Sequence, residues 1–134
     1  MTVRLIRSPG LASAPYAYAA VVDRLVFTAG ACPLDDHGVV VAPGDFTEQA
    51  HQVMRNLSVA LADAGSGLQH IAKSTVYVAS SSRTDLSAVW EVVRSYLGDH
   101  DAPSTLLGVA ALGYENQLVE VEVVAVQSEA ELTS

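Results

Sequence analysis

The sequence has few charged residues and a single cysteine. Charged residues make up 16% of the 134 positions, whereas typical soluble domains contain roughly 25%. A small domain has a large surface, so this shortage suggests that part of the surface is buried against other subunits. One cysteine excludes an internal disulfide framework and fits a reducing compartment. We therefore expect a cytoplasmic oligomer.

Basic residues and long apolar runs are also lacking. Seven Lys and Arg stand against fifteen Asp and Glu, which gives a net charge of −8. Phosphate-backbone binding needs clustered cations, so we expect no nucleic-acid partner. No apolar run is long enough to cross a bilayer, and the N-terminus lacks a basic segment followed by an apolar one. We therefore expect no membrane partner and no signal peptide.

The motifs of several enzyme classes are missing. Walker, GxSxG and dinucleotide-binding fingerprints do not occur, which removes support for NTPase, hydrolase-triad and Rossmann functions. The four histidines are scattered without metal-ligand spacing, so we expect no metal site. They are His37, His51, His70 and His100.

Two amphipathic helices are predicted from their caps and spacing. Residues 45–48 (DFTE) have the form of a capping box, and apolar residues then recur every three or four positions as far as Gly65. Residues 82–85 (SRTD) form a second capping-box pattern, and the helix after it ends at Gly98.

Runs rich in Val, Thr and aromatic residues predict the strands. We expect them over residues 3–6, 16–22, 25–29, 71–79, 106–112 and 118–126. The order β-β-β-α-β-α-β-β favours a single α+β domain, residues 1–134, with two helices on one face of a mixed β-sheet. The other face then needs a partner.

The last predicted strand carries the most informative residue. Residues 113–116 (GYEN) indicate a hairpin or tight connection into it. Glu120 and Glu122 alternate with valines, and from Val123 onward the strand is apolar on both faces, which is typical of a strand that is covered on both sides. Glu120 is therefore a carboxylate in apolar surroundings, and either a rim charge or a functional group.

Two other residues have ordinary explanations. Cys32 lies just after a predicted strand end, where a thiolate could be exposed, but a lone cysteine without a basic neighbour is more often a packed side chain. Trp90 has helical spacing with Leu86 and Val93, which is more typical of a core or interface residue than of a ligand platform.

Five stretches, taken in order, resemble the RidA (YjgF) family. They are Pro15-Tyr16, Thr28-Ala29-Gly30, KSTVYV at 73–78, GVAAL at 108–112 and VEVE at 119–122. The resemblance implies a chorismate-mutase-like fold and a homotrimer with small-molecule ligands in clefts between subunits. It also implies that no metal or organic cofactor is needed.

Active members of the family hydrolyse reactive enamines and imines, such as 2-aminoacrylate, to 2-oxo acids and ammonia. The resemblance implies that Glu120 positions water and moves protons, with Tyr16 as its catalytic neighbour. The implied substrate-binding positions are Gly30, Ala31, Trp90, Ser104 and Thr105.

One expected residue is absent. The family's arginine, which grips the substrate carboxylate, falls on Ser104. Hydrogen bonds to a charged group contribute roughly 1.5–3 kcal/mol each, so its loss costs about 100-fold in recognition of a 2-imino acid. Two hypotheses follow: an imine or enamine deaminase whose substrate lacks the α-carboxylate or binds it through another subunit's arginine, or a non-catalytic homotrimer that binds small molecules or proteins. Retention of Tyr16 and Glu120 favours the enzyme.

Overall fold

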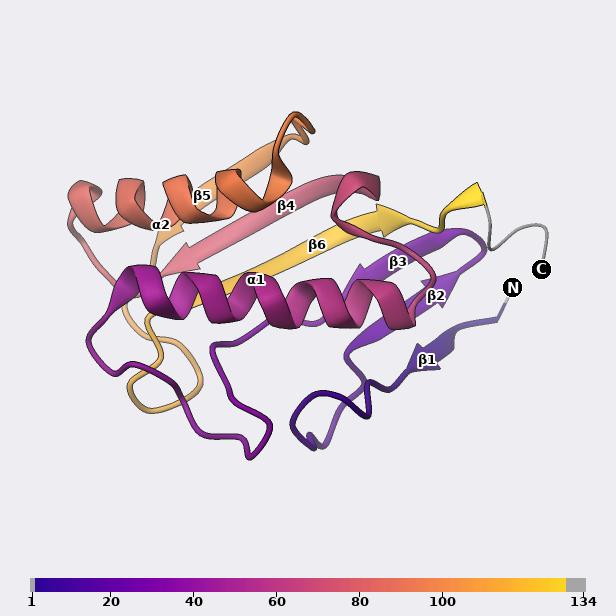
Figure 1. Ribbon diagram of the computed structural model, residues 1–134, viewed down its shortest axis with the longest axis horizontal. Coiled ribbons are helices and arrows are strands. Elements are labelled where there is room, and N and C mark those ends of the chain that lie inside the picture. The colour runs from indigo at the N-terminus through magenta and orange to yellow at the C-terminus, as the bar shows by residue number, and fades with distance from the viewer. Residues whose placement is uncertain (1, 130–134) are drawn as a thin grey trace.

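A computed structural model describes residues 2–129 as a six-stranded sheet with two helices on one face (Figure 1). The predicted order of elements is confirmed. The strands are β1 (Arg4–Ile6), β2 (Ala19–Val22), β3 (Leu25–Thr28), β4 (Ile71–Val78), β5 (Ser104–Gly108) and β6 (Val119–Val126). The helices are α1 (Phe46–Asp63) and α2 (Arg83–Leu97), and a short 3-10 helix, Leu68–His70, precedes β4.

The sheet is mixed, with strand order β1-β2-β3-β6-β4-β5. Within residues 2–129, only β4 and β5 pair in parallel. Of the two alternatives predicted for residues 113–116, a hairpin or a tight connection, the hairpin is wrong, because β4 lies between the last two strands. Helix α2 is the crossover connection between β4 and β5, which lets β5 run parallel to β4. Strand β5 lies at the outer edge of the sheet, next to β4. The segment 113–118 then crosses the end of β4, and Asn116 adopts a left-handed conformation there (φ 67°).

The helix caps follow the sequence with one exception. Asp45 accepts a hydrogen bond from the backbone N–H of Glu48 at 3.0 Å, as the capping box requires. The predicted box at 82–85 is not formed, because Asp85 instead accepts a hydrogen bond from the Ser80 hydroxyl at 2.7 Å. Within residues 2–129 no helix is long and apolar enough to cross a membrane.

Strand β6 has two different faces. Val119, Val121, Val123 and Ala125 are buried against the helices, whereas the residues between them are half-exposed on the opposite face. We call this opposite side the open face, because no helix within residues 2–129 covers it. Large apolar side chains are exposed there: Leu5, Leu25, Phe27 and Leu107.

Candidate functional site

Glu120 lies near the start of β6, on the open face and directly opposite Tyr77 of β4. One carboxylate oxygen, Oε1, accepts hydrogen bonds from the Gln117 amide at 3.0 Å and the Cys32 thiol at 3.4 Å. Within residues 2–129 the other oxygen, Oε2, has no hydrogen-bond partner. The carboxylate is thus fixed through one oxygen and available through the other.

Gly30 provides the space for Oε2. A Cβ atom added at Gly30 would lie 2.0 Å from Oε2, which is well inside van der Waals contact. The backbone here cannot retreat, because Ala31 is bridged to β6: its N–H donates to the Val121 carbonyl at 2.7 Å. The glycine is therefore required by close approach to the Glu120 side chain.

The orientation of the Gln117 amide is determined by its partners. Its oxygen accepts the backbone N–H of Tyr114 at 3.1 Å, so its nitrogen must face Glu120 and the Val119 carbonyl. Gln117 is buried. It therefore presents a fixed donor to Oε1.

Two amides on α1 hold the segments around Glu120. The buried Gln49 donates to the Asn116 carbonyl at 2.9 Å and accepts the Leu118 N–H at 2.8 Å. Asn56 donates to the carbonyls of Cys32 and Leu34, each at 2.9 Å. Residues seven apart share a helix face, so one face of α1 positions both segments that reach Glu120.

Tyr16 borders a small apolar cavity whose lining also includes Gly30 and Cys32. Its hydroxyl lies 3.3 Å from that of Tyr114. Partial burial, and then the hydrogen bond with Tyr114, raise the pKa of Tyr16 above its usual value. The hydroxyl is therefore neutral at physiological pH and can donate a hydrogen bond.

The Cys32 thiol is protonated in this setting. Burial, reinforced by the negative charge of Glu120, raises the pKa of Cys32 to about 12. A thiol with such a pKa donates a hydrogen bond and is a poor nucleophile at neutral pH. The interpretation of Cys32 as an inert packed residue captured its low reactivity but missed its contact with the carboxylate.

The neighbouring glutamate is engaged elsewhere. Glu122 lies on the same face of β6 and accepts a hydrogen bond from the Tyr77 hydroxyl. That hydrogen bond, followed by burial, raises the pKa of Tyr77 to about 12. Glu122 thus resembles Glu120 in chemistry but differs in its surroundings.

The other predicted substrate-binding residues lie at a different place in the chain. Ser104 pairs with Ser74, three rows along β4 from the Tyr77–Glu120 pair, which corresponds to about 10 Å. The two serine hydroxyls are 2.5 Å apart. Ser104 and Trp90 border a common groove between α2 and the edge strand β5, whereas Thr105, one residue on, belongs to the open face beside Thr75.

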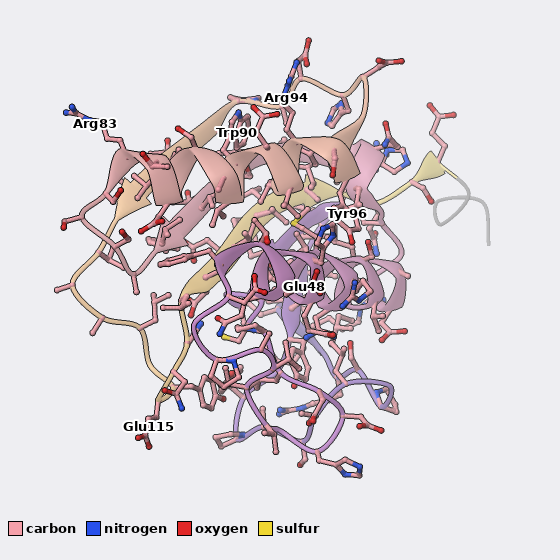
Figure 2. All side chains as sticks on the ribbon, turned by 60° about the vertical axis from the view of Figure 1, so that its left-hand side comes forward. Glu48, Arg83, Trp90, Arg94, Tyr96 and Glu115 are labelled. Carbon is pink, nitrogen blue, oxygen red and sulfur yellow. The ribbon has the colours of Figure 1, made fainter. Side chains whose placement is uncertain are left out.

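Figure 2 shows how labelled residues of α2 lie relative to α1. Trp90 and Arg94 lie on the side of α2 away from α1, and Tyr96 lies on the side toward α1. Glu115, in the connection that leads to β6, lies at the opposite end of the view. One chain therefore brings Glu120, Tyr16, Gly30 and Ala31 together but leaves Trp90 and Ser104 apart from them.

Sequence reasoning missed Gln117 and Tyr114 altogether. The sequence offered one indication of Gln117, namely its position. It stands three residues before Glu120 and directly follows Asn116, a residue type that favours turns. Among residues 2–129 there is no group of three or more His, Cys, Asp and Glu side chains placed to hold a metal ion.

The chain is thus a small α+β protein with two helices on one face of a mixed sheet and a glutamate carboxylate packed against a strand-end glycine. The chain belongs to the RidA (YjgF) family: the family model described as Endoribonuclease L-PSP matches residues 7–127.

Individual relatives agree with this assignment. The chain is 34% identical over 118 residues to the RutC family protein UK114 of Drosophila melanogaster, covering 88% of this chain and 83% of that protein. It is also 34% identical over 113 residues to a 2-iminobutanoate/2-iminopropanoate deaminase of Capra hircus, covering 84% and 80%.

Solved structures share the fold. A protein of Thermotoga maritima described as a putative endoribonuclease superposes with a TM-score of 0.84 at 30% identity, covering 96% of this chain and 99% of that one. E. coli TdcF with bound serine superposes with a TM-score of 0.80 at 26% identity, covering 93% and 99%.

Proposed function

We propose that this protein is a cytoplasmic deaminase that hydrolyses a reactive imine or enamine to a carbonyl compound and ammonia. The observation that supports it most is the asymmetric environment of the Glu120 carboxylate. Gln117 and Cys32 hold Oε1, while Oε2 is unpaired within residues 2–129 and faces the space left by Gly30. Such a carboxylate can hold a water molecule and take its proton.

The chemistry needs only this proton carrier. Water held on Oε2 attacks the imine carbon, the C=N π electrons move to nitrogen, and Glu120 passes the proton from water to that nitrogen. The resulting carbinolamine has a C–OH and a C–NH2 bond. Glu120 then takes the hydroxyl proton and delivers it to nitrogen as the C–N bond breaks, which releases ammonia and forms the carbonyl group. The carboxylate ends in its starting state.

The neutral side chains around Glu120 suit this role. The thiol of Cys32 and the amide of Gln117 donate to the carboxylate without supplying a positive charge. The neutral hydroxyl of Tyr16, which borders the small cavity together with Gly30 and Cys32, can donate to the developing oxygen or nitrogen lone pair of the substrate. Pre-positioned donors of this kind stabilise charge as it develops.

A homotrimer would complete the site. The open face exposes Leu5, Leu25 and Phe27, each more than 40% accessible, and an exposed apolar face of this size is typical of an interface. Strand β5 is an edge strand with unpaired backbone groups along one side. Clefts between copies would bring the α2–β5 groove of one subunit to the Glu120 of the next.

The relatives support the reaction class. Several are named 2-iminobutanoate/2-iminopropanoate deaminase, and TdcF carries bound serine, a small amino acid. Here, however, the Ser104 hydroxyl is bonded to Ser74 and to the Ala102 carbonyl. Without another cation at this place, we therefore expect weak turnover of 2-aminoacrylate. The same observation favours the second candidate, a small-molecule-binding homotrimer without activity.

A panel of enzymatically generated imines, with and without a carboxylate, tests the proposal by ammonia release. We expect one class to be hydrolysed by the wild type and Glu120→Gln to lose about 10²–10⁴-fold in kcat. Glu122→Gln is the matched control, because its carboxylate lies two residues away on the same face. Equal activity in Glu120→Gln and the wild type would exclude the mechanism. No turnover of any imine, together with saturable ligand binding, would favour the non-catalytic alternative.

A further inference from the structure

The groove between α2 and β5 contains a cation as well as an aromatic ring. Trp90 and Arg94 are four residues apart on α2, and so they share one face of the helix. Both border the groove together with Ser104, His100 and Asp101. Figure 2 shows Trp90 and Arg94 on the same side of α2.

The Arg94 guanidinium is only loosely engaged. Its one ion pair within residues 2–129 is with Glu91 at 3.8 Å, and both side chains are about two-thirds exposed. Exposed pairs of this kind are weak and exchange readily with other partners. Arg94 can therefore turn to a ligand without breaking a packed interaction.

The other arginines are less well placed. Arg24 donates to the Gln127 carbonyl and Arg55 to the Gln52 side chain. Arg83 lies at the opposite end of α2, where it borders a separate hollow with Gly108. Among the cations of residues 2–129, Arg94 is the one that borders a groove with Ser104.

We propose that Arg94 binds the substrate carboxylate in this chain. The inference rests on the proposed function and deepens it by naming the residue that takes the place of the carboxylate-binding arginine missing at Ser104. A guanidinium offers two parallel N–H donors that match both oxygens of a carboxylate. The Trp90 ring beside it provides a flat apolar wall for the rest of a small planar molecule.

Asp101 limits the negative charge of a ligand that this groove can bind. Its exposed side chain borders the same groove, so a second negative charge on the ligand is repelled. His100 is held in place by its Nε2–H, which donates to the Ile71 carbonyl at 2.7 Å.

Trp90 makes binding measurable without activity. It is the single tryptophan of the chain, and so intrinsic fluorescence reports on this groove. We expect 2-oxobutanoate, the product of hydrolysing 2-iminobutanoate, to change the fluorescence saturably, and propanal, which differs by the missing carboxylate, to bind more weakly. Arg94→Ala should raise the Kd for 2-oxobutanoate about 10- to 100-fold, the range expected for a lost charge-assisted pair.

Kinetics give the second measurement. For Arg94→Ala we expect KM for 2-iminobutanoate to rise while that for propan-1-imine, which differs by the missing carboxylate, stays the same. Arg94→Lys should recover only part of the loss, because an ammonium cannot bind bidentately. Ser104→Arg added to Arg94→Ala should lower the KM again. Arg83→Ala is the matched control and should leave both substrates unaffected.

The outcomes separate this inference from the proposed function. If the wild type hydrolyses imines but Arg94→Ala keeps its Kd and KM, or if Arg83→Ala shows the loss instead, Arg94 is not the carboxylate-binding residue. If 2-oxobutanoate binds through Arg94 but no imine is hydrolysed, the binding site stands and the deaminase function fails.

Discussion

The surroundings of Glu120 and the α2–β5 groove belong to one sheet but are built in different ways. Around Glu120, buried amides from α1 and from the segment before β6 fix the carboxylate with hydrogen bonds to backbone groups. In the groove, Arg94 is exposed and loosely paired, and the Ser104 hydroxyl is turned to Ser74. The first region is complete within one chain, whereas the second is open at a sheet edge.

This difference suggests a division of roles: the surroundings of Glu120 would serve proton transfer, and the α2–β5 groove would serve substrate specificity. The residues that hold Glu120 also stabilise the fold, so a change among them affects both folding and proton transfer. In the groove, Arg94 and Ser104 are exposed, so these two residues can change with little effect on stability. The replacement of an expected arginine by Ser104, with Glu120 and Gly30 retained, fits such a division.

The largest effect should come from a charge on the open face. Such a charge would prevent assembly and so separate the α2–β5 groove of one subunit from the Glu120 of the next. Phe27 is 42% exposed and opposite Val124. Phe27→Asp should convert a trimer into 14.0 kDa monomers, measured by light scattering, and reduce ammonia release to background. Val59→Asp, at an exposed apolar site on α1, is the control and should remain assembled. A monomeric variant with full activity would show that one chain suffices.

Gly30→Ala should have the next largest effect, confined to the Glu120 side. The new methyl group would overlap Oε2, so the carboxylate must turn away. A displacement of about 1 Å can cost about 100-fold in rate, and we expect a loss of that order in kcat while trimer mass is unchanged.

Gly67→Ala is the control for this substitution. Gly67 has an extended backbone (φ −174°), which any residue adopts, and nothing lies within 4 Å of an added Cβ. Activity in Gly67→Ala should match the wild type. A fully active Gly30→Ala would mean that Glu120 does not need its observed position.

Sequence patterns predicted most of the fold because they depend on local chemistry. The alternation at Glu120, the cap at Asp45 and the glycine after α1 each act within a few residues. The composition of residues 113–116 led to the wrong hairpin prediction. A turn-prone composition does not indicate whether the following strand pairs with the preceding strand or lies on the far side of a third strand. That choice depends on the parallel β4–β5 pair, which is a long-range property.

The candidate site was predictable only where a residue type signals its own role. Glu120 stood out as a charge in an apolar strand. Gln117, Gln49 and Asn56 are amides whose importance lies in contacts to distant backbone groups, and no local pattern marks them. Arg94 is likewise one exposed helical arginine among several until β5 is placed beside it.

A smaller effect, mainly on stability, is expected for Gln49→Leu. The substitution leaves the Leu118 N–H and the Asn116 carbonyl without their partner in a buried setting. We expect a loss of about 2–4 kcal/mol in the free energy of unfolding, measured in urea at a fixed protein concentration. Gln52→Leu, whose side-chain partners Asn56 and Arg55 lie on α1 itself, should lose less. Equal losses would contradict the role given to Gln49.

The smallest effect concerns Cys32 and appears only in alkaline solution. Burial and then the Glu120 charge raise its pKa from 9.0 to about 12. Below pH 9 the thiol is protonated in both states and adds no pH dependence. Between pH 9 and 12 the unfolded chain loses this proton and the folded chain keeps it, so stability falls as pH rises. Cys32→Ala should lessen that slope by about 1.4 kcal/mol per pH unit.

Alkylation of Cys32 by iodoacetamide tests the same contact at the Glu120 carboxylate. The thiolate is the reactive form, so a native thiol with a raised pKa should react slowly at pH 8.5 and faster after unfolding. Glu120→Gln removes the neighbouring negative charge, which should lower the thiol pKa and speed alkylation of the folded protein. Glu122→Gln should not, because that carboxylate is bonded to Tyr77. Equal rates in both variants would show that Cys32 does not sense the carboxylate.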